Sequence, residues 1–128
     1  MPNETADGGA PLDRPERHTV LLELEREVAA DPARVFPLLV RRITPTDGHT
    51  KFAVYPDHFT AVMQGGWWYR GEYRVIPAPG GAKVSYTVVN VAQRLHEGGR
   101  LVSKGIVAKS PNTFARHLDA IEDSLRPE

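Results

Sequence analysis

The chain has 128 residues, with 16 Lys or Arg and 16 Asp or Glu, so its formal net charge is zero. One domain is expected at this length, and a neutral chain is a poor candidate for general binding of nucleic acids or anionic membranes. The absence of cysteine excludes disulfides, thiolate metal sites and a cysteine nucleophile. No apolar run approaches the ~18 residues of a membrane span, and a secretory signal pattern is lacking. We therefore expect a cytoplasmic protein without a membrane span.

The N-terminal third predicts a tail, a strand and a helix. Residues 1–16 are rich in Pro, Gly and acidic residues, which predicts a disordered tail followed by one domain over residues 17–128. Apolar residues then alternate with glutamates from Val20 to Val28, as in a half-buried strand. Asp31-Pro32 predicts a helix start, and the helix is expected to end near Arg42.

The middle of the chain predicts an antiparallel run of strands over 51–55, 58–64 and 67–76. Read with period two, the last of these has an inward face and an outward face. The inward set is Trp67, Tyr69, Gly71, Tyr73 and Val75, and the solvent-facing set is Trp68, Arg70, Glu72, Arg74 and Ile76. An aromatic face beside a glycine suits a wall that leaves room for a flat apolar ligand. An ordinary core strand is the alternative interpretation, since aromatics are common in strands.

The C-terminal part predicts one more strand, over 83–91, and a final helix. Residues 93–109 are ambiguous, and Leu101–Lys109 fits either a strand or an irregular lead-in. Ser110-Pro111 predicts the helix start, and its apolar stripe is Phe114, Leu118, Ile121 and Leu125. The order of elements predicts an α+β fold in which a curved antiparallel sheet packs against helices.

This pattern resembles the START-like superfamily, also called Bet v 1-like or SRPBCC, over residues 18–126. The resemblance rests on the first strand running into Ala-Ala-Asp-Pro-Ala-Arg-Val-Phe (29–36), on the antiparallel strands and on the capped C-terminal helix. Within the superfamily the chain is most similar to small bacterial polyketide cyclase/dehydrase-like proteins. The resemblance implies a helix-grip fold, in which a sheet of five to seven strands wraps around the long helix and encloses a hydrophobic cavity.

The candidate ligand-binding residues are those expected to line the concave face: Phe59, Met63, Trp67, Tyr69, Tyr73, Tyr86, Asn90, Phe114 and His117. His117 lies at the edge of the helix stripe, where it is either an acid–base group or a hydrogen-bonded seam residue. The five histidines lack the spacing of known zinc sites, so neither a metal nor a cofactor is expected.

Three functional hypotheses follow. The leading one is binding of a small hydrophobic or aromatic molecule, polyketide- or lipid-like, between the sheet and the C-terminal helix. The second is a polyketide aromatase/cyclase in which His117 and Tyr69 or Tyr73 form an acid–base pair. The third is a structural or dimerising domain without a ligand, with Trp68 and Ile76 on an outward face as a homodimer contact.

Overall fold

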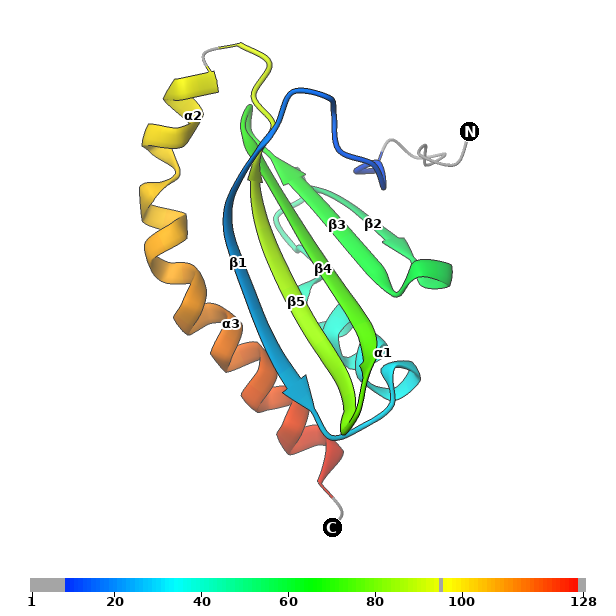
Figure 1. The fold of residues 1–128 in the computed structure, drawn as a ribbon. Helices are drawn as coiled ribbons and strands as arrows, with labels where there is room; N and C mark the ends of the chain where they lie inside the picture. The colour runs from blue at the N-terminus through cyan, green and yellow to red at the C-terminus, as the bar shows by residue number, and fades with distance from the viewer. Residues whose placement is uncertain (1–8, 95, 127–128) are drawn as a thin grey trace.

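The computed structural model describes residues 9–94 and 96–126, and it has the expected α+β architecture. A five-stranded antiparallel sheet curves beside a long C-terminal helix, as in a helix-grip fold (Figure 1). The elements in chain order are β1 (Thr19–Val28), α1 (Pro32–Ile43), β2 (Lys51–Tyr55), the 3-10 turn η1 (Pro56–His58), β3 (Thr60–Gly65), β4 (Tyr69–Ala78), β5 (Gly81–Asn90), α2 (His96–Val102) and α3 (Lys104–Leu125).

The sheet brings the first and last strands together. Its order is β1-β5-β4-β3-β2, so β1 pairs antiparallel with β5 over nearly its whole length, from Thr19 opposite Asn90 to Val28 opposite Ala82. The helix α1 contacts β4 and β5, while α3 contacts β1 and α1. Figure 1 shows α3 running beside β1 and α1 behind the sheet. The helices therefore define an inner face of the sheet, and the opposite face is the outer one.

The helix α1 forms where the sequence predicts it. Pro32 occupies the first turn, and the backbone carbonyl of Asp31 accepts hydrogen bonds from the N–H groups of Arg34 and Val35. Its buried side chains are Val35, Phe36, Leu39 and Ile43. Burying each such side chain contributes ~1.5–3 kcal/mol, so this stripe fixes the helix against the sheet.

The C-terminal helix starts earlier than predicted. The expected start at Ser110-Pro111 is wrong, because α3 begins at Lys104 and contains Pro111. Ser110 does not cap the helix; its hydroxyl donates to the carbonyl of Ile106 at 2.7 Å. A proline in a helix removes one backbone donor, a cost that the packing of the stripe below it offsets. Leu101–Lys109 is correspondingly mainly helical, with one turn residue at Ser103 between α2 and α3, and both the strand and the irregular lead-in are wrong.

The aromatic strand, predicted to begin at Trp67, begins two residues later at Tyr69. Residues 66–68 form a turn, with Gly66 at a φ of 62°, and β4 begins at Tyr69. The turn breaks the period-two alternation, so the exposure of the two tryptophans is the reverse of the prediction. Trp67 is 49% exposed and Trp68 is 9% exposed, against the prediction that Trp67 faces inward and Trp68 outward.

The outer face is more closed than predicted. Arg70 is fully buried and Glu72 nearly so, although both were expected to face solvent, while Arg74 and Ile76 are exposed as expected. The cause is the N-terminal segment: residues 9–14 lie against this face, and Ala10 is fully buried. The structure thus differs from the predicted disordered tail over residues 9–16, while residues 1–8 lie outside the described part of the chain.

Candidate functional site

The centre of the inner face is a stack of aromatic rings from three elements. Tyr73 of β4 and Tyr86 of β5 face each other in the strand register, and their rings stack with centroids 4.3 Å apart at 18°. Phe114 of α3 continues the stack, 6.4 Å from Tyr86 at 17°. All three side chains are buried, and such pairs contribute ~0.5–1.5 kcal/mol beyond their burial. The stack joins the sheet to α3.

The tyrosine hydroxyls form a polar group within this apolar wall. The hydroxyls of Tyr69 and Tyr86 are 2.6 Å apart and share a hydrogen bond. Burial raises the pKa of Tyr69, Tyr73 and Tyr86 above its ordinary value. All three stay protonated at neutral pH, so each can donate a hydrogen bond but none is a ready base.

The glycine in the aromatic strand does not leave the gap that the sequence suggested. A Cβ at Gly71 would collide with the hydroxyl of Tyr69 and lie 2.9 Å from Tyr69 Cζ and 3.1 Å from Tyr86 Cε1. The space beside the glycine is thus filled by the protein's own rings. At this position the ordinary core interpretation is correct.

Phe59 and Met63 line the part of the inner face nearest the β2 edge. Phe59 follows η1 in the left-handed region, with a φ of 47°, and its ring packs edge-on against Phe36 at 5.6 Å. Met63 lies opposite Gly71 of β4 and opposite Phe52 of β2. Phe52, Phe59 and Met63 are half-buried against the core, so the helices do not fully cover this part of the sheet.

Asn90 has a structural role at the end of β5. Its side-chain amide donates to the carbonyl of His96 at 2.7 Å, and its carbonyl oxygen accepts from the N–H of Ala92 at 3.0 Å. A Cβ at Gly99 would lie 2.6 Å from that same oxygen. Asn90 therefore holds the start of α2 with its amide nitrogen and the segment before α2 with its amide oxygen.

His117 lies half-buried on α3. Within the described part of the chain its Nδ1 is buried and has no hydrogen-bond partner. Burial lowers the pKa of His117, and the positive charges of Arg42 and Arg116 lower it further. The ring is therefore neutral at pH 7, and Nδ1 can accept a hydrogen bond when that ring is the Nε2–H tautomer.

The two tryptophans do not belong to the aromatic wall in the expected way. Trp67 lines an open surface hollow of about 520 Å³ with Val91, Gln93 and Arg94. Trp68 instead packs edge-on against Tyr69 at 5.5 Å. Because Trp68 is buried, it does not supply the exposed homodimer contact that the sequence suggested.

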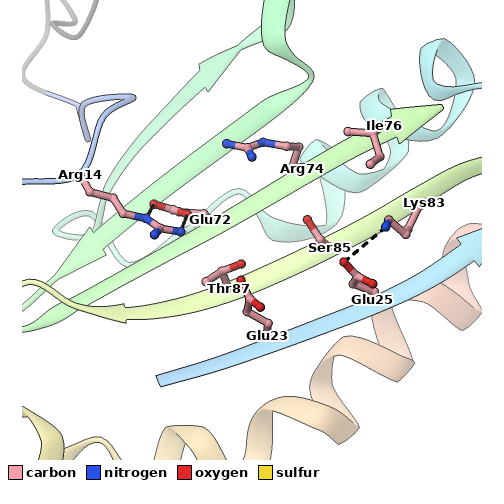
Figure 2. A pocket seen from close by; sticks show the side chains of 9 residues that line it. All are labelled: Arg14, Glu23, Glu25, Glu72, Arg74, Ile76, Lys83, Ser85 and Thr87. Atoms are coloured by element: carbon pink, nitrogen blue, oxygen red, sulfur yellow. Dashed lines mark hydrogen bonds and ion pairs between the residues drawn. The ribbon is translucent and has the colours of Figure 1, made fainter. Parts of the chain in front are cut away.

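The outer face carries a second, polar hollow that the sequence analysis missed. It has a volume of about 200 Å³ and is lined by Arg14, Glu23, Glu25, Glu72, Arg74, Ile76, Lys83, Ser85 and Thr87 (Figure 2). Arg14 pairs with Glu72 at 2.7 Å, and Lys83 pairs with Glu25 at 3.5 Å. The charged side of the strand alternation was visible in the sequence, but nothing in it indicated that residues 9–14 return to this face.

Within the described residues, no cluster of three or more His, Asp or Glu side chains could hold a metal ion. In the same residues, no helix combines the length and the apolar character needed to cross a bilayer.

Comparisons with known proteins do not identify a family for this chain. No protein-family model matches the chain, and no curated protein matches it. A solved structure that does match is the crystal structure of TTHA0849 from Thermus thermophilus. Its sequence identity is 16%, the match covers 80% of this chain and 94% of that one, and the TM-score is 0.48. A likeness at this level carries no inference about family or function.

Proposed function

We propose that the protein binds a small hydrophobic or aromatic molecule, polyketide- or lipid-like, between the inner face of the sheet and α3. The observation that carries this proposal is an aromatic inner face that the helices cover only in part. Tyr73, Tyr86 and Phe114 are buried, while Phe59, Met63 and Tyr69 beside them are half-buried and packed against the core. Binding sites for small apolar molecules have such walls, with a few placed polar groups.

The polar groups on this wall define the ligand further. The protonated hydroxyls of Tyr69 and Tyr86 form one such group, and the neutral ring of His117 on α3 is another. Each offers a hydrogen bond without a formal charge. They suit a ligand with carbonyl or hydroxyl groups on an apolar body, since an apolar wall with neutral hydrogen-bonding groups compensates a charged ligand poorly for its lost hydration.

The resemblance to the START-like superfamily supports the same proposal. The order of elements, the antiparallel sheet and the long C-terminal helix are those that the resemblance implies. The sheet has five strands, the lower end of the expected range. We infer a ligand that lies against an open wall, because the rings behind that wall already contact one another.

Titration with a neutral, apolar fluorescent probe tests the proposal. The probe is expected to bind at one site, and Met63→Glu is expected to weaken binding about tenfold or more, because the ligand would have to be buried against a charge. Ile76→Glu is the matched control, since it adds the same charge to a partly exposed apolar position outside the inner face. Equal affinity in the two variants, or no saturable binding to the folded protein, would contradict the proposal.

A second candidate is an acid–base enzyme of the aromatase/cyclase type, and His117 favours it. A neutral histidine whose buried Nδ1 has no partner within the described residues has the protonation state of a general base. Incubation with a poly-β-keto thioester would then give a cyclised, dehydrated product. His117→Gln should abolish that product and leave probe affinity within about twofold, whereas a variant that keeps full turnover would exclude the role.

A further inference from the structure

The outer face holds an extended segment of the chain mainly by its backbone. Arg70 donates from Nη1 to the carbonyl of Pro11 at 2.8 Å and from Nη2 to the carbonyl of Leu12 at 2.6 Å. The hydroxyl of Tyr55 donates to the carbonyl of Ala10 at 2.5 Å. Three successive carbonyls are thus recognised by side chains of β2 and β4, in a way that does not depend on the side chains of the bound segment.

The recognising arginine is itself fixed in place. Arg70 is fully buried, its Nε–H donates to Glu72 at 2.7 Å, and its Nη1 also reaches the side-chain oxygen of Gln64 at 3.0 Å. A buried guanidinium needs acceptors for all its donors, and the segment's carbonyls supply two of them. The groove is therefore built to hold carbonyl groups, and it is incomplete without a peptide in it.

Three positions of the segment add specificity. The side chain of Ala10 is fully buried, so the first position accepts only a small residue. Pro11 favours an extended backbone and has no N–H to satisfy. Arg14 makes a forked pair with Glu72, from Nε at 2.8 Å and from Nη2 at 2.7 Å. The recognised pattern is a small residue followed by proline, with arginine four positions after the small residue.

We propose that this groove, formed by Tyr55, Gln64, Arg70 and Glu72, is a peptide-binding site for extended segments of the class Ala-Pro-x-x-Arg. Residues 10–14 occupy it in cis and compete with a partner that carries the same pattern. The tether to β1 is short, so the segment's effective concentration is in the millimolar range and the intact chain binds such a partner weakly. Weakening the cis segment opens the site.

The test uses the full-length protein and a fluorescently labelled peptide, Gly-Ala-Pro-Leu-Asp-Arg-Pro-Glu-Arg, followed by anisotropy. Arg14→Ala removes the fork to Glu72 but leaves the backbone carbonyls, so this variant should bind the peptide about tenfold or more tightly than the intact chain. Arg14→Lys should fall between them, because it keeps the charge and loses the fork. Arg17→Ala, at an exposed position outside the groove, should behave like the intact chain.

The peptide itself supplies the specificity control. Replacing its first arginine by alanine should weaken binding to the Arg14→Ala variant about tenfold, because Glu72 then lacks its forked partner. A urea midpoint for each variant verifies folding. No binding to a folded Arg14→Ala or Arg14→Lys protein, or equal binding of a scrambled peptide, would overturn the proposal. None of these outcomes depends on the inner-face ligand.

Discussion

At the scale of single residues, Gly71 is a position of the inner face where the neighbouring rings leave no room for a side chain. Gly71→Ala is expected to destabilise the fold by about 1–3 kcal/mol, the range for overpacking, because the new Cβ meets the rings of Tyr69 and Tyr86. Urea unfolding measures the loss. Gly80→Ala is the control, since a Cβ there has no atom within 4 Å. Equal stability of the two variants would mean that Tyr69 moves aside freely.

The two tryptophans give a direct reading of where β4 begins. In single-tryptophan variants, iodide should quench the protein that retains Trp67 more strongly, since that side chain is 49% exposed against 9% for Trp68. Stronger quenching of the variant that retains Trp68 would mean that Trp67 faces inward and Trp68 outward, as the sequence alone predicts. Period-two alternation correctly placed Tyr69, Tyr73 and Val75 on the inner face. It cannot locate where a strand begins, and here the turn at residues 66–68, with Gly66 at a positive φ, precedes the first residue of β4.

At the scale of elements, α3 is held by its apolar stripe. Leu118 is fully buried, and Leu118→Ala is expected to cost about 2–5 kcal/mol of unfolding free energy, the range for truncating a buried leucine. Chemical denaturation with Arg116→Ala as an exposed control measures the difference. A loss below ~0.5 kcal/mol, the size of ordinary surface changes, would show that α3 does not hold the fold together.

The N-terminal segment should respond to acid through Glu72. Burial alone would raise the pKa of Glu72, but hydrogen bonds from Arg14 and Arg70 outweigh it and hold that pKa below its usual 4.5. A carboxyl with a depressed pKa stabilises the fold above about pH 4.5 and loses this effect as the pH falls further. Glu72→Gln should therefore flatten the decline of the urea midpoint from pH 5 to pH 3. Glu25→Gln, at an exposed carboxyl, should keep the wild-type slope.

The errors at this scale have one physical origin each. Ser110-Pro111 has the local chemistry of a helix start, but a serine can also bond back to the carbonyl four residues earlier, as it does to Ile106, and the helix continues through it. Residues 9–14 have the composition of a tail, yet their backbone carbonyls accept hydrogen bonds from the side chains of Arg70 and Tyr55. The position of residues 9–14 depends on contacts between segments distant in sequence, which local patterns do not contain. The Ser110 bond is local, but the residue pattern alone does not decide between it and a helix cap.

At the scale of the whole molecule, the fold class and the inner aromatic wall could be predicted, and the outer groove could not. Alternation and helix stripes report which face of an element is apolar, and that suffices to place Tyr73, Tyr86 and Phe114 together. Glu72 and Arg70 look like solvated charges in any local pattern. Their burial follows from a covering segment some 58 residues away in the chain.

The measurement that tests the central claim most directly is an amide NMR titration of the intact protein with a neutral naphthol. The inner face should bind it, so the largest saturable shift changes are expected around Met63, Tyr69, Phe114 and His117, with those around Arg14 and Glu72 unchanged. Saturable changes confined to the outer face or to the Trp67 hollow would contradict the claim that the inner face binds a small apolar molecule. The absence of saturable changes, at probe concentrations where the folded protein stays soluble, would contradict it as well.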